Sequence, residues 1–252
     1  MKVIPVAGLS GSGKTTFIRN LIPLLREFGP VGTVKHAGRH GLDLPPGKDT
    51  TVMFGAGAAA VAGIDGEKML LTLGDASLAT ALDILSERGV ATAVVEGWKS
   101  IPWPKVVIGD LETDGCILRN PGPAEVIRQR DRFPDYFTVG EILRELGEGR
   151  REKGQACTTA TATIPLPAGL KEDSLSSLES ALPGFVNGMK NLPGAPGVRA
   201  AIRRGSLVGG TDEILIAVAA GSGEEAATVL QIALSRLRKI LDGTLIPVRR
   251  RD

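Results

Sequence analysis

The 252-residue sequence predicts a mixed α/β fold, with a mostly parallel sheet flanked by helices and a smaller α+β domain near the C-terminal end. Three observations carry this prediction. A short apolar stretch, Lys2 to Ala7, runs into a glycine-rich loop and then into an amphipathic helix. Apolar runs then alternate with helical patterns as far as position 147, as in layered α/β domains. Beyond that point a charged, glycine-rich stretch precedes a second set of elements.

The glycine-rich loop, Gly8 to Thr15, fits G-x-x-x-x-G-K-[ST], the phosphate-binding loop (P-loop) of nucleotide triphosphatases. Its glycines let consecutive backbone N–H groups point inward at an anion. Lys14 supplies a positive charge for the β- and γ-phosphates, and the Thr15 hydroxyl suits Mg²⁺. The loop lies between a predicted strand and a predicted helix, which favours this function over a chance glycine-rich turn. One irregularity is Pro5, which cannot donate a hydrogen bond in a central strand. The predicted phosphate-binding residues are Gly8, Ser10, Gly11, Ser12, Gly13, Lys14, Thr15 and Thr16.

A second strand is predicted from Val31 to Lys35, and it runs into a loop that contains both histidines. The following stretch, 42–49, has two prolines and a glycine and predicts an ordered loop. It carries Asp43, Lys48 and Asp49, which could face a bound nucleotide or Mg²⁺. A solvated surface loop is the alternative.

A third candidate element is the apolar strand from Val90 to Val95, which ends in Glu96. Carboxylates at strand ends lie where open α/β sheets bind ligands. In a phosphate site such a carboxylate meets Mg²⁺ or orients water. We therefore predict Glu96 in the Mg²⁺ shell with Thr15 and Asp49, and we assign the catalytic roles to Lys14 and Glu96. A surface glutamate at a strand end is the alternative.

The only two tryptophans, Trp98 and Trp103, follow this strand in a loop that Pro102 and Pro104 stiffen. A flat ring beside a nucleotide site can stack on a base or a pterin. Tryptophans that cover the core are more frequent. The sequence leaves both interpretations open.

Apolar periodicity and turn residues predict the remaining elements. Helices are expected at 14–28, 49–54, 75–88, 138–146 and after 222, and strands at 58–64, 68–72, 105–108, 115–118, 158–165, 198–204 and 213–220. Thr138 with Glu141 and Ser222 with Glu225 have the spacing of a capping box. The stretch 183–197, with three prolines and four glycines, predicts irregular structure. The predicted domains are a nucleotide-binding domain at 1–147, a charged linker at 148–157 and an α+β domain at 158–252.

Composition limits the classes of function. Lys and Arg number 30 against 28 Asp and Glu, which argues against a general nucleic-acid binder. No apolar run approaches the ~18–20 residues of a membrane span, and the N-terminal sequence does not resemble a signal peptide. Cys116 and Cys157 lack a C-x-x-C companion, and the two histidines are too few for a zinc site by themselves. We expect a cytoplasmic protein without nucleic-acid or membrane partners.

Several runs together resemble the MobB family, the GTP-binding proteins of molybdopterin-guanine dinucleotide biosynthesis. They are I-P-V-A-G-L-S-G-S-G-K-T-T, V-K-H, P-P-G-K-D-T, A-G-A and V-V-E-G-W-K, in the family's order over about the first 145 residues. The resemblance implies a homodimer that binds GTP and Mg²⁺, hydrolyses GTP slowly at best and works beside a MobA-type guanylyltransferase, which attaches GMP to molybdopterin. An N-K-x-D guanine signature is not found, so the preference for guanine rests on the resemblance. The resemblance also implies molybdopterin as a further ligand. It implies six further binding residues, which are Lys35, His36, Lys48, Asp49, Trp98 and Lys99.

From about residue 198 the chain is similar to MoaE, the large subunit of molybdopterin synthase, over V-R-A-A-I-R-R-G-S-L-V-G-G-T-D-E-I-L-I-A-V and the helix that follows. It departs from that family in three places. Ser222-Gly223 replaces a His-Arg pair, Arg238 with Lys239 beside it stands at the catalytic lysine, and Val248-Arg249 replaces a W-K. Arginine is no substitute for a catalytic lysine because it is always protonated. The resemblance therefore implies a binding or dimerisation role, with a small MoaD-like sulfur carrier as partner if the domain is a working subunit.

Three functions follow from these patterns. The first is a GTP-binding accessory protein of molybdenum or tungsten cofactor maturation. Its hydrolysis should be slow without an arginine finger, which contributes ~10³–10⁵-fold, and Arg39 is the candidate for that role. The second is a small-molecule kinase that uses Asp49 or Glu96 as base. The third is a synthase subunit that requires Lys239.

Overall fold

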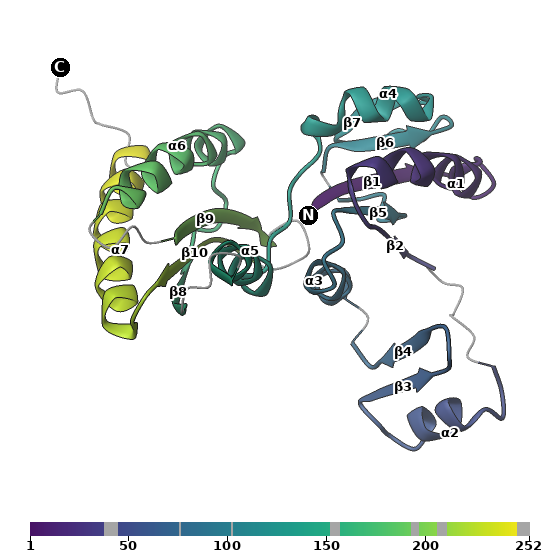
Figure 1. The fold of residues 1–252 in the computed structure, drawn as a ribbon. Coiled ribbons are helices and arrows are strands. Elements are labelled where there is room, and N and C mark those ends of the chain that lie inside the picture. Colours follow the sequence, from purple (N-terminus) through teal and green to yellow (C-terminus); the bar gives the residue numbers. More distant parts are fainter. Residues whose placement is uncertain are drawn as a thin grey trace. The chain divides into compact units, whose positions relative to one another are not determined.

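The computed structural model describes residues 1–37, 45–75, 77–101, 103–151, 157–192, 197–205 and 211–245 (Figure 1). By its internal contacts the chain divides into two compact units. We call residues 4–84 and 92–133 the P-loop unit, and residues 1–3, 85–91 and 134–252 the C-terminal unit.

The P-loop unit is built on a five-stranded sheet in the order β2-β5-β1-β6-β7. The β2–β5, β1–β6 and β6–β7 ladders are parallel, which confirms the predicted fold class. Parallel strands end at one edge of the sheet, and ligands bind where the strand order reverses, which here is at β1. The register between β1 and β6 begins at Val6, so Pro5 lies before the part of β1 that pairs with β6. The strands are β1 (Lys2–Gly8), β2 (Val31–Lys35), β5 (Thr92–Glu96), β6 (Lys105–Ile108) and β7 (Cys116–Arg119).

Helices pack on this sheet through apolar side chains. From α1 (Lys14–Leu25), the residues Ile18, Leu21 and Leu25 are buried against strand residues that include Val6 and Val94. Val126 of α4 (Pro123–Arg128) joins the same core. The sequence pattern did not predict α4, because six residues are too few to show a helical period. Further helices are α3 (Leu78–Glu87) and the 3₁₀ turns η1 (Arg26–Phe28) and η2 (Arg130–Arg132).

The predicted hairpin around Asp65-Gly66 is present. Its strands are β3 (Ala60–Ile64) and β4 (Met69–Leu73), and α2 (Asp49–Gly55) contacts β3. At the turn, the Asp65 carboxylate accepts hydrogen bonds from the N–H groups of Glu67 and Lys68, both at 2.8 Å. We call residues 49–73 the hairpin lobe (Figure 1). Its large apolar side chains are 43–77% exposed at Val52, Met53, Ile64, Met69, Leu70 and Leu71.

The C-terminal unit contains an antiparallel sheet in the order β8-β10-β9. Its strands are β8 (Thr158–Pro165), β9 (Gly197–Arg204) and β10 (Asp212–Ala220). One face, with Ile214 and Ile216, shares a core with α6 (Glu172–Lys190) and α7 (Gly223–Leu245). The other face, with Leu215 and Ala217, packs against α5 (Val139–Arg151), because side chains alternate along a strand.

Helix α6 corrects the prediction of irregular structure at 183–197, because it continues through Pro183 to Lys190. Pro183 is exposed, and residues 193–196 lie outside the described part. The apolar pattern of α6 therefore outweighs its proline and glycines, since a helix is stabilised mainly by the face that it buries. The buried residues of α6, at helical spacing, are Leu175, Leu178, Leu182, Phe185 and Met189.

Helix α5 belongs to the C-terminal unit, although its sequence lies within the predicted first domain. It also extends to Arg151, into the stretch predicted as linker at 148–157. The Glu141 N–H donates to Thr138 Oγ1 at 3.1 Å, as the capping-box spacing predicted. Ile142 of α5 is buried against β10, so packing joins this helix to the second sheet.

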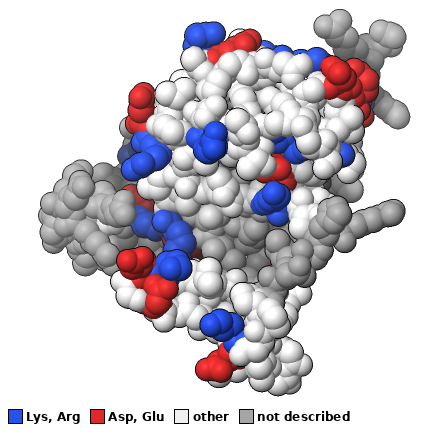
Figure 2. Space-filling view, turned by 90° about the vertical axis from the view of Figure 1, so that its right-hand side faces the viewer, with Lys and Arg blue, Asp and Glu red and all other residues white. Residues whose placement is uncertain are grey.

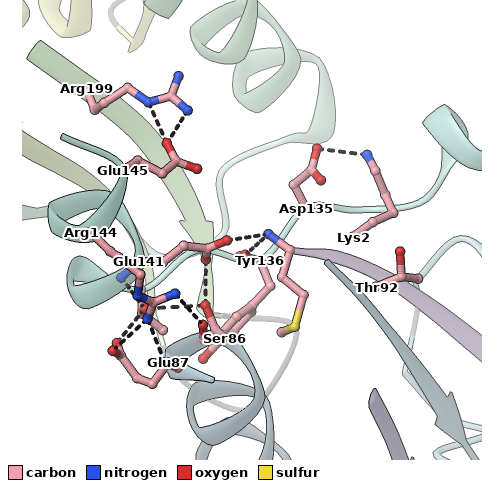
Figure 3. Close-up of polar contacts among 12 residues, drawn as sticks. Lys2, Ser86, Glu87, Thr92, Asp135, Tyr136, Glu141, Arg144, Glu145 and Arg199 are labelled. Carbon is pink, nitrogen blue, oxygen red and sulfur yellow. Dashed lines mark hydrogen bonds and ion pairs between the residues drawn. The ribbon is translucent and has the colours of Figure 1, made fainter. Parts of the chain in front are cut away.

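A polar network holds the flanking segments of this unit around α5 (Figure 3). The Glu141 carboxylate accepts one hydrogen bond from the Met1 ammonium at 2.9 Å and another from the Ser86 hydroxyl. Arg144 donates to the Glu87 carbonyl at 2.7 Å. Glu145 forms an ion pair with Arg199 of β9. These contacts explain why residues far apart in the sequence fall into one compact unit.

Charged side chains of both signs are interspersed with uncharged ones on the face shown in Figure 2. This distribution agrees with the formal net charge of +2. Of the helices within the described ranges, none has both the length and the apolar character to cross a membrane.

Candidate functional site

The P-loop closes between β1 and α1 in the conformation that an anion-binding loop requires. Gly13, the residue before α1, has a φ of 91°, and Gly11 has a φ of 76°; both values favour glycine. At Gly8 a Cβ would lie 2.4 Å from the Ile108 carbonyl oxygen and 2.6 Å from Ser12 Oγ. Gly8 therefore allows the loop to lie against the end of β6. The N-terminus of α1, with its dipole, opens directly into this loop.

Lys14 and Ser12 contribute polar groups at this loop. The Lys14 ammonium donates to the Leu9 carbonyl oxygen at 2.7 Å, so it lies over the loop. Ser12 Oγ is buried and has no hydrogen-bond partner among the described residues. A buried polar atom without a partner is uncommon in folded proteins. The loop thus presents an ammonium and an unsatisfied hydroxyl, which suits a phosphate.

Thr15 and Glu96, the two residues predicted to bind Mg²⁺ together with Asp49, lie close to each other at the carboxyl edge of the sheet. The Thr15 hydroxyl, in the first turn of α1, lies 3.4 and 3.5 Å from the two carboxylate oxygens of Glu96, the last residue of β5. Oxygen ligands of this kind suit Mg²⁺, which keeps several waters and binds phosphate oxygens as well. The described residues hold no group of three or more His, Cys, Asp or Glu side chains arranged for a metal. The pair therefore fits Mg²⁺ only together with nucleotide phosphates.

Lys35 and His36 lie beside this pair at the end of β2. Lys35 is the register partner of Glu96, and the His36 N–H donates to the Glu96 carbonyl oxygen at 2.9 Å. The His36 ring stacks on the ring of Trp98, with centroids 4.7 Å apart and an interplanar angle of 26°. Trp98 is half-buried and Trp103 is 1% exposed, so only the second behaves as a core tryptophan.

Lys48 and Asp49 are not joined to the site by any described contact. Lys48 precedes α2 and Asp49 is its first residue, and their side chains make no hydrogen bond or ion pair with a described residue. Their roles at the nucleotide or Mg²⁺ stay predictions. Asp43 and Arg39 lie outside the described residues.

The sequence analysis did not predict a role at the site for three nearby residues. Gly109, which follows β6, has a φ of 83°, and its N–H donates to the Asn120 side-chain oxygen at 2.6 Å. A Cβ on Gly109 would lie 3.3 Å from Ser12 Cβ, so this bend also lies against the loop. The signal was available, because Gly109 and Asn120 each follow a strand of a parallel sheet.

Lys105 is the third such residue, and it is 1% exposed at the start of β6. Its ammonium donates to the carbonyl oxygens of Lys99, at 3.0 Å, and of Ile101. Thr113 Oγ1 donates to the same Lys99 oxygen at 2.6 Å. Burial lowers the pKa of Lys105, and the nearby Asp114 and Cys116 oppose this shift. Lys105 therefore fixes the loop that carries Trp98 and Lys99.

These features define the class: an α/β domain of the P-loop type, with its candidate site at the carboxyl edge of a mostly parallel sheet. Residues 3–119 match the family described as "Molybdopterin guanine dinucleotide synthesis protein B" (MobB). The similarity to this family is confined to the N-terminal part of the chain.

Two curated relatives are also similar to this chain. One is the "Probable molybdopterin-guanine dinucleotide biosynthesis adapter protein" of Bacillus subtilis, 36% identical over 111 residues. The other is the "Molybdopterin-guanine dinucleotide biosynthesis adapter protein" of Haemophilus influenzae, 31% identical over 112 residues. Each match covers 42% of this chain, with 64% of the first relative's length and 62% of the second's.

Two solved structures are also similar. Bacillus subtilis MobB has a TM-score of 0.42 at 24% identity and covers 53% of this chain and 99% of its own. The MobB homologue of Bacillus stearothermophilus has a TM-score of 0.36 at 23% identity and covers 52% of this chain and 94% of its own. The resemblance of the chain to MoaE from about residue 198 stays a prediction.

Proposed function

We propose that the protein binds GTP with Mg²⁺ and acts as an accessory protein in molybdopterin-guanine dinucleotide biosynthesis. The observation that carries the proposal is the contact of Thr15 with Glu96 beside Lys14, at the end of a P-loop. Both curated relatives bear the word "adapter" in their names, which supports an accessory role. The partner we propose is a MobA-type guanylyltransferase, the enzyme that would use the guanine nucleotide.

Hydrolysis of GTP by the isolated protein is proposed to be slow. No arginine or glutamine side chain hydrogen-bonds to the Gly8–Thr15 loop in the described ranges. An arginine finger contributes about 10³–10⁵-fold to turnover in related chemistry. The accessory function therefore rests on binding and transfer of nucleotide.

The C-terminal unit is proposed to bind a partner or ligand without transferring sulfur. Ser222 serves as the cap of α7, because its hydroxyl accepts the Glu225 N–H at 3.2 Å. Arg238 and Lys239 are exposed on α7. A working synthase subunit would instead use Lys239 and bind a MoaD-like sulfur carrier. Loss of sulfur transfer on Lys239→Ala, with the small carrier protein present, would reverse this assignment.

We also propose that the protein is a homodimer that pairs through the hairpin lobe. A two-stranded hairpin is only marginally stable by itself. This one leaves six large apolar side chains exposed, which favours a covered surface. A second copy is the simplest cover, since a two-fold contact uses the same patch twice.

The test of nucleotide binding is calorimetric titration of GTP and ATP, each with and without Mg²⁺. Wild-type protein should bind GTP with Mg²⁺ more tightly than ATP. Lys14→Ala should weaken GTP binding by at least about tenfold, or about 1.4 kcal/mol. Lys171→Ala, an exposed lysine of the C-terminal unit, is the matched control and should bind like wild type.

Other outcomes contradict the proposal in distinct ways. Preference for ATP, with phosphate transferred to an acceptor, would point to a small-molecule kinase. Absence of binding by either nucleotide would mean that the loop does not serve as a nucleotide site.

A further inference from the structure

Trp98 is held in a backbone conformation that tryptophan rarely adopts. Its φ is +43°, in the left-handed region, where a bulky residue is an outlier. The preceding Gly97 has a φ of +111°, and a Cβ there would lie 2.8 Å from His36 Cβ. Such strain persists only where surrounding contacts impose it, and it concentrates at ligand sites.

The surrounding contacts fix this loop from both ends. The Gly97 N–H donates to the Val6 carbonyl oxygen at 3.1 Å, which joins the loop to β1. At the other end, buried Lys105 holds the Lys99 and Ile101 carbonyl oxygens. The Trp98 ring is therefore set in place before any ligand arrives, which is how binding sites are preorganised.

The two rings of the pair differ in exposure. His36 is exposed while Trp98 is half-buried, so Trp98 backs the His36 ring and the stack can continue outward from His36. The pair lies at the carboxyl ends of β2 and β5, on one flank of the P-loop. On the other flank, after β6 and β7, lie Gly109 and Asn120. A nucleotide with its phosphates at Gly8–Thr15 has only one base, and that base can occupy only one of these two flanks. The other flank can then hold a second planar ligand.

We propose that the His36–Trp98 pair is a stacking platform for the pterin ring of the second ligand. This inference rests on the proposed function, because the dinucleotide named in the relatives joins a pterin to a guanine nucleotide. Bicyclic pterins are flat and favour offset stacking on aromatic rings. His36 would contact the ring, and Trp98 and Lys105 are positioning residues that hold His36 and the loop.

The test uses neopterin, which is fluorescent, as the pterin probe and N-methylanthraniloyl-GTP as the nucleotide probe. Wild-type protein should bind neopterin saturably. His36→Ala should weaken neopterin binding at least about tenfold, because loss of one stacking contact costs about that much affinity. The same variant should weaken nucleotide binding less. His36→Phe should restore neopterin binding, because it keeps an aromatic ring at this position. Trp98→Ala should weaken neopterin binding even though it leaves His36 intact. Lys14→Ala should lose the nucleotide and keep neopterin.

Each contrary result overturns the inference. These results are unsaturable neopterin binding by wild type, unchanged binding in His36→Ala, or loss of neopterin binding in Lys14→Ala. A larger loss for the nucleotide than for neopterin in His36→Ala would assign the platform to guanine instead. Neopterin binding without any nucleotide binding would leave the platform intact while the proposed GTP function fails, so the two failures differ. Thermal unfolding of each variant confirms that it is folded.

Discussion

Lys105 places an ammonium group where almost no solvent reaches, and it donates hydrogen bonds to the carbonyl oxygens of Lys99 and Ile101. Its lowered pKa means that the folded chain binds this proton less tightly than the unfolded chain does. Below the folded pKa both states are protonated, and the penalty for burying the charge is complete. As pH rises toward the ordinary value of 10.5, the folded chain releases the proton first, so stability rises.

Lys105→Met should remove this pH dependence. The free energy of unfolding of wild type, relative to the variant, should increase between about pH 7 and about pH 10. Urea unfolding of both proteins at the two pH values measures this difference. Because other titrating groups are common to both proteins, they cancel. An equal difference at both pH values would contradict the lowered pKa.

At the scale of elements, α6 contains Pro183 in its interior, and burial of the helix's apolar face offsets the cost of this proline. An interior proline removes a helix hydrogen bond and clashes with the preceding turn, at a cost of about 3 kcal/mol. Pro183→Ala should therefore stabilise the C-terminal unit by part of this amount, about 1–2 kcal/mol. Calorimetric melting temperatures measure the gain.

The matched control for this change is Pro167→Ala, in the loop after β8. There the proline restricts the unfolded chain, so its removal should lower stability by about 0.4–1 kcal/mol. A loss of stability in Pro183→Ala would contradict a continuous α6 helix, and a gain in Pro167→Ala would contradict the assumption that this proline stabilises by restricting the unfolded chain.

The hairpin lobe is the proposed contact between two copies of the chain. Ile64→Lys together with Leu70→Lys should shift the protein from dimer toward monomer, because buried charges without partners are strongly unfavourable at an interface. Light scattering after size-exclusion chromatography measures the mass. Glu67→Lys, at the exposed turn, changes the charge without removing apolar surface and should remain dimeric. A lobe that instead binds the guanylyltransferase would leave the wild type monomeric.

At the scale of the whole molecule, each of the two compact units has a hydrophobic core of its own. One surrounds Leu21 and Val94 in the P-loop unit, and the other surrounds Leu178 and Ile216 in the C-terminal unit. Units with their own cores can unfold as separate cooperative transitions. Calorimetry of the full chain should therefore show two transitions.

Each transition should respond to a different change. GTP with Mg²⁺ should raise only the P-loop transition, by about 2.7 kcal/mol of stabilisation at a ligand concentration 100-fold above the Kd. Leu178→Ala should lower only the other transition, by about 2–5 kcal/mol, because it leaves a cavity in a fully buried position. A single transition that moves with both changes would show that the two cores unfold together.

The sequence by itself determined the features that depend on near neighbours in the chain. The P-loop from Gly8 to Thr15 is one contiguous motif, so its glycines, Lys14 and the strand–helix context could be read together. The position of Glu96 at the end of β5 was also predictable, because a carboxylate after an apolar strand is a local signal. A parallel sheet brings strand ends together, which places Glu96 near Thr15, while its role at Mg²⁺ stays a prediction. The boundaries of β8 agree with the prediction because its residues alternate clearly.

Tertiary structure alone decided the contacts that join distant segments. His36 and Trp98 meet because β2 pairs with β5, and the sequence of neither strand predicts this pairing. Lys105 became a support of the site because its ammonium reaches back to the preceding loop. Helix α5 joined the second sheet, and α6 formed through Pro183, because burial of their apolar faces outweighed the local signals of linker and turn. The physical reason is common to all: local propensity is weak, and the free energy of packing depends on which surfaces the whole fold brings together.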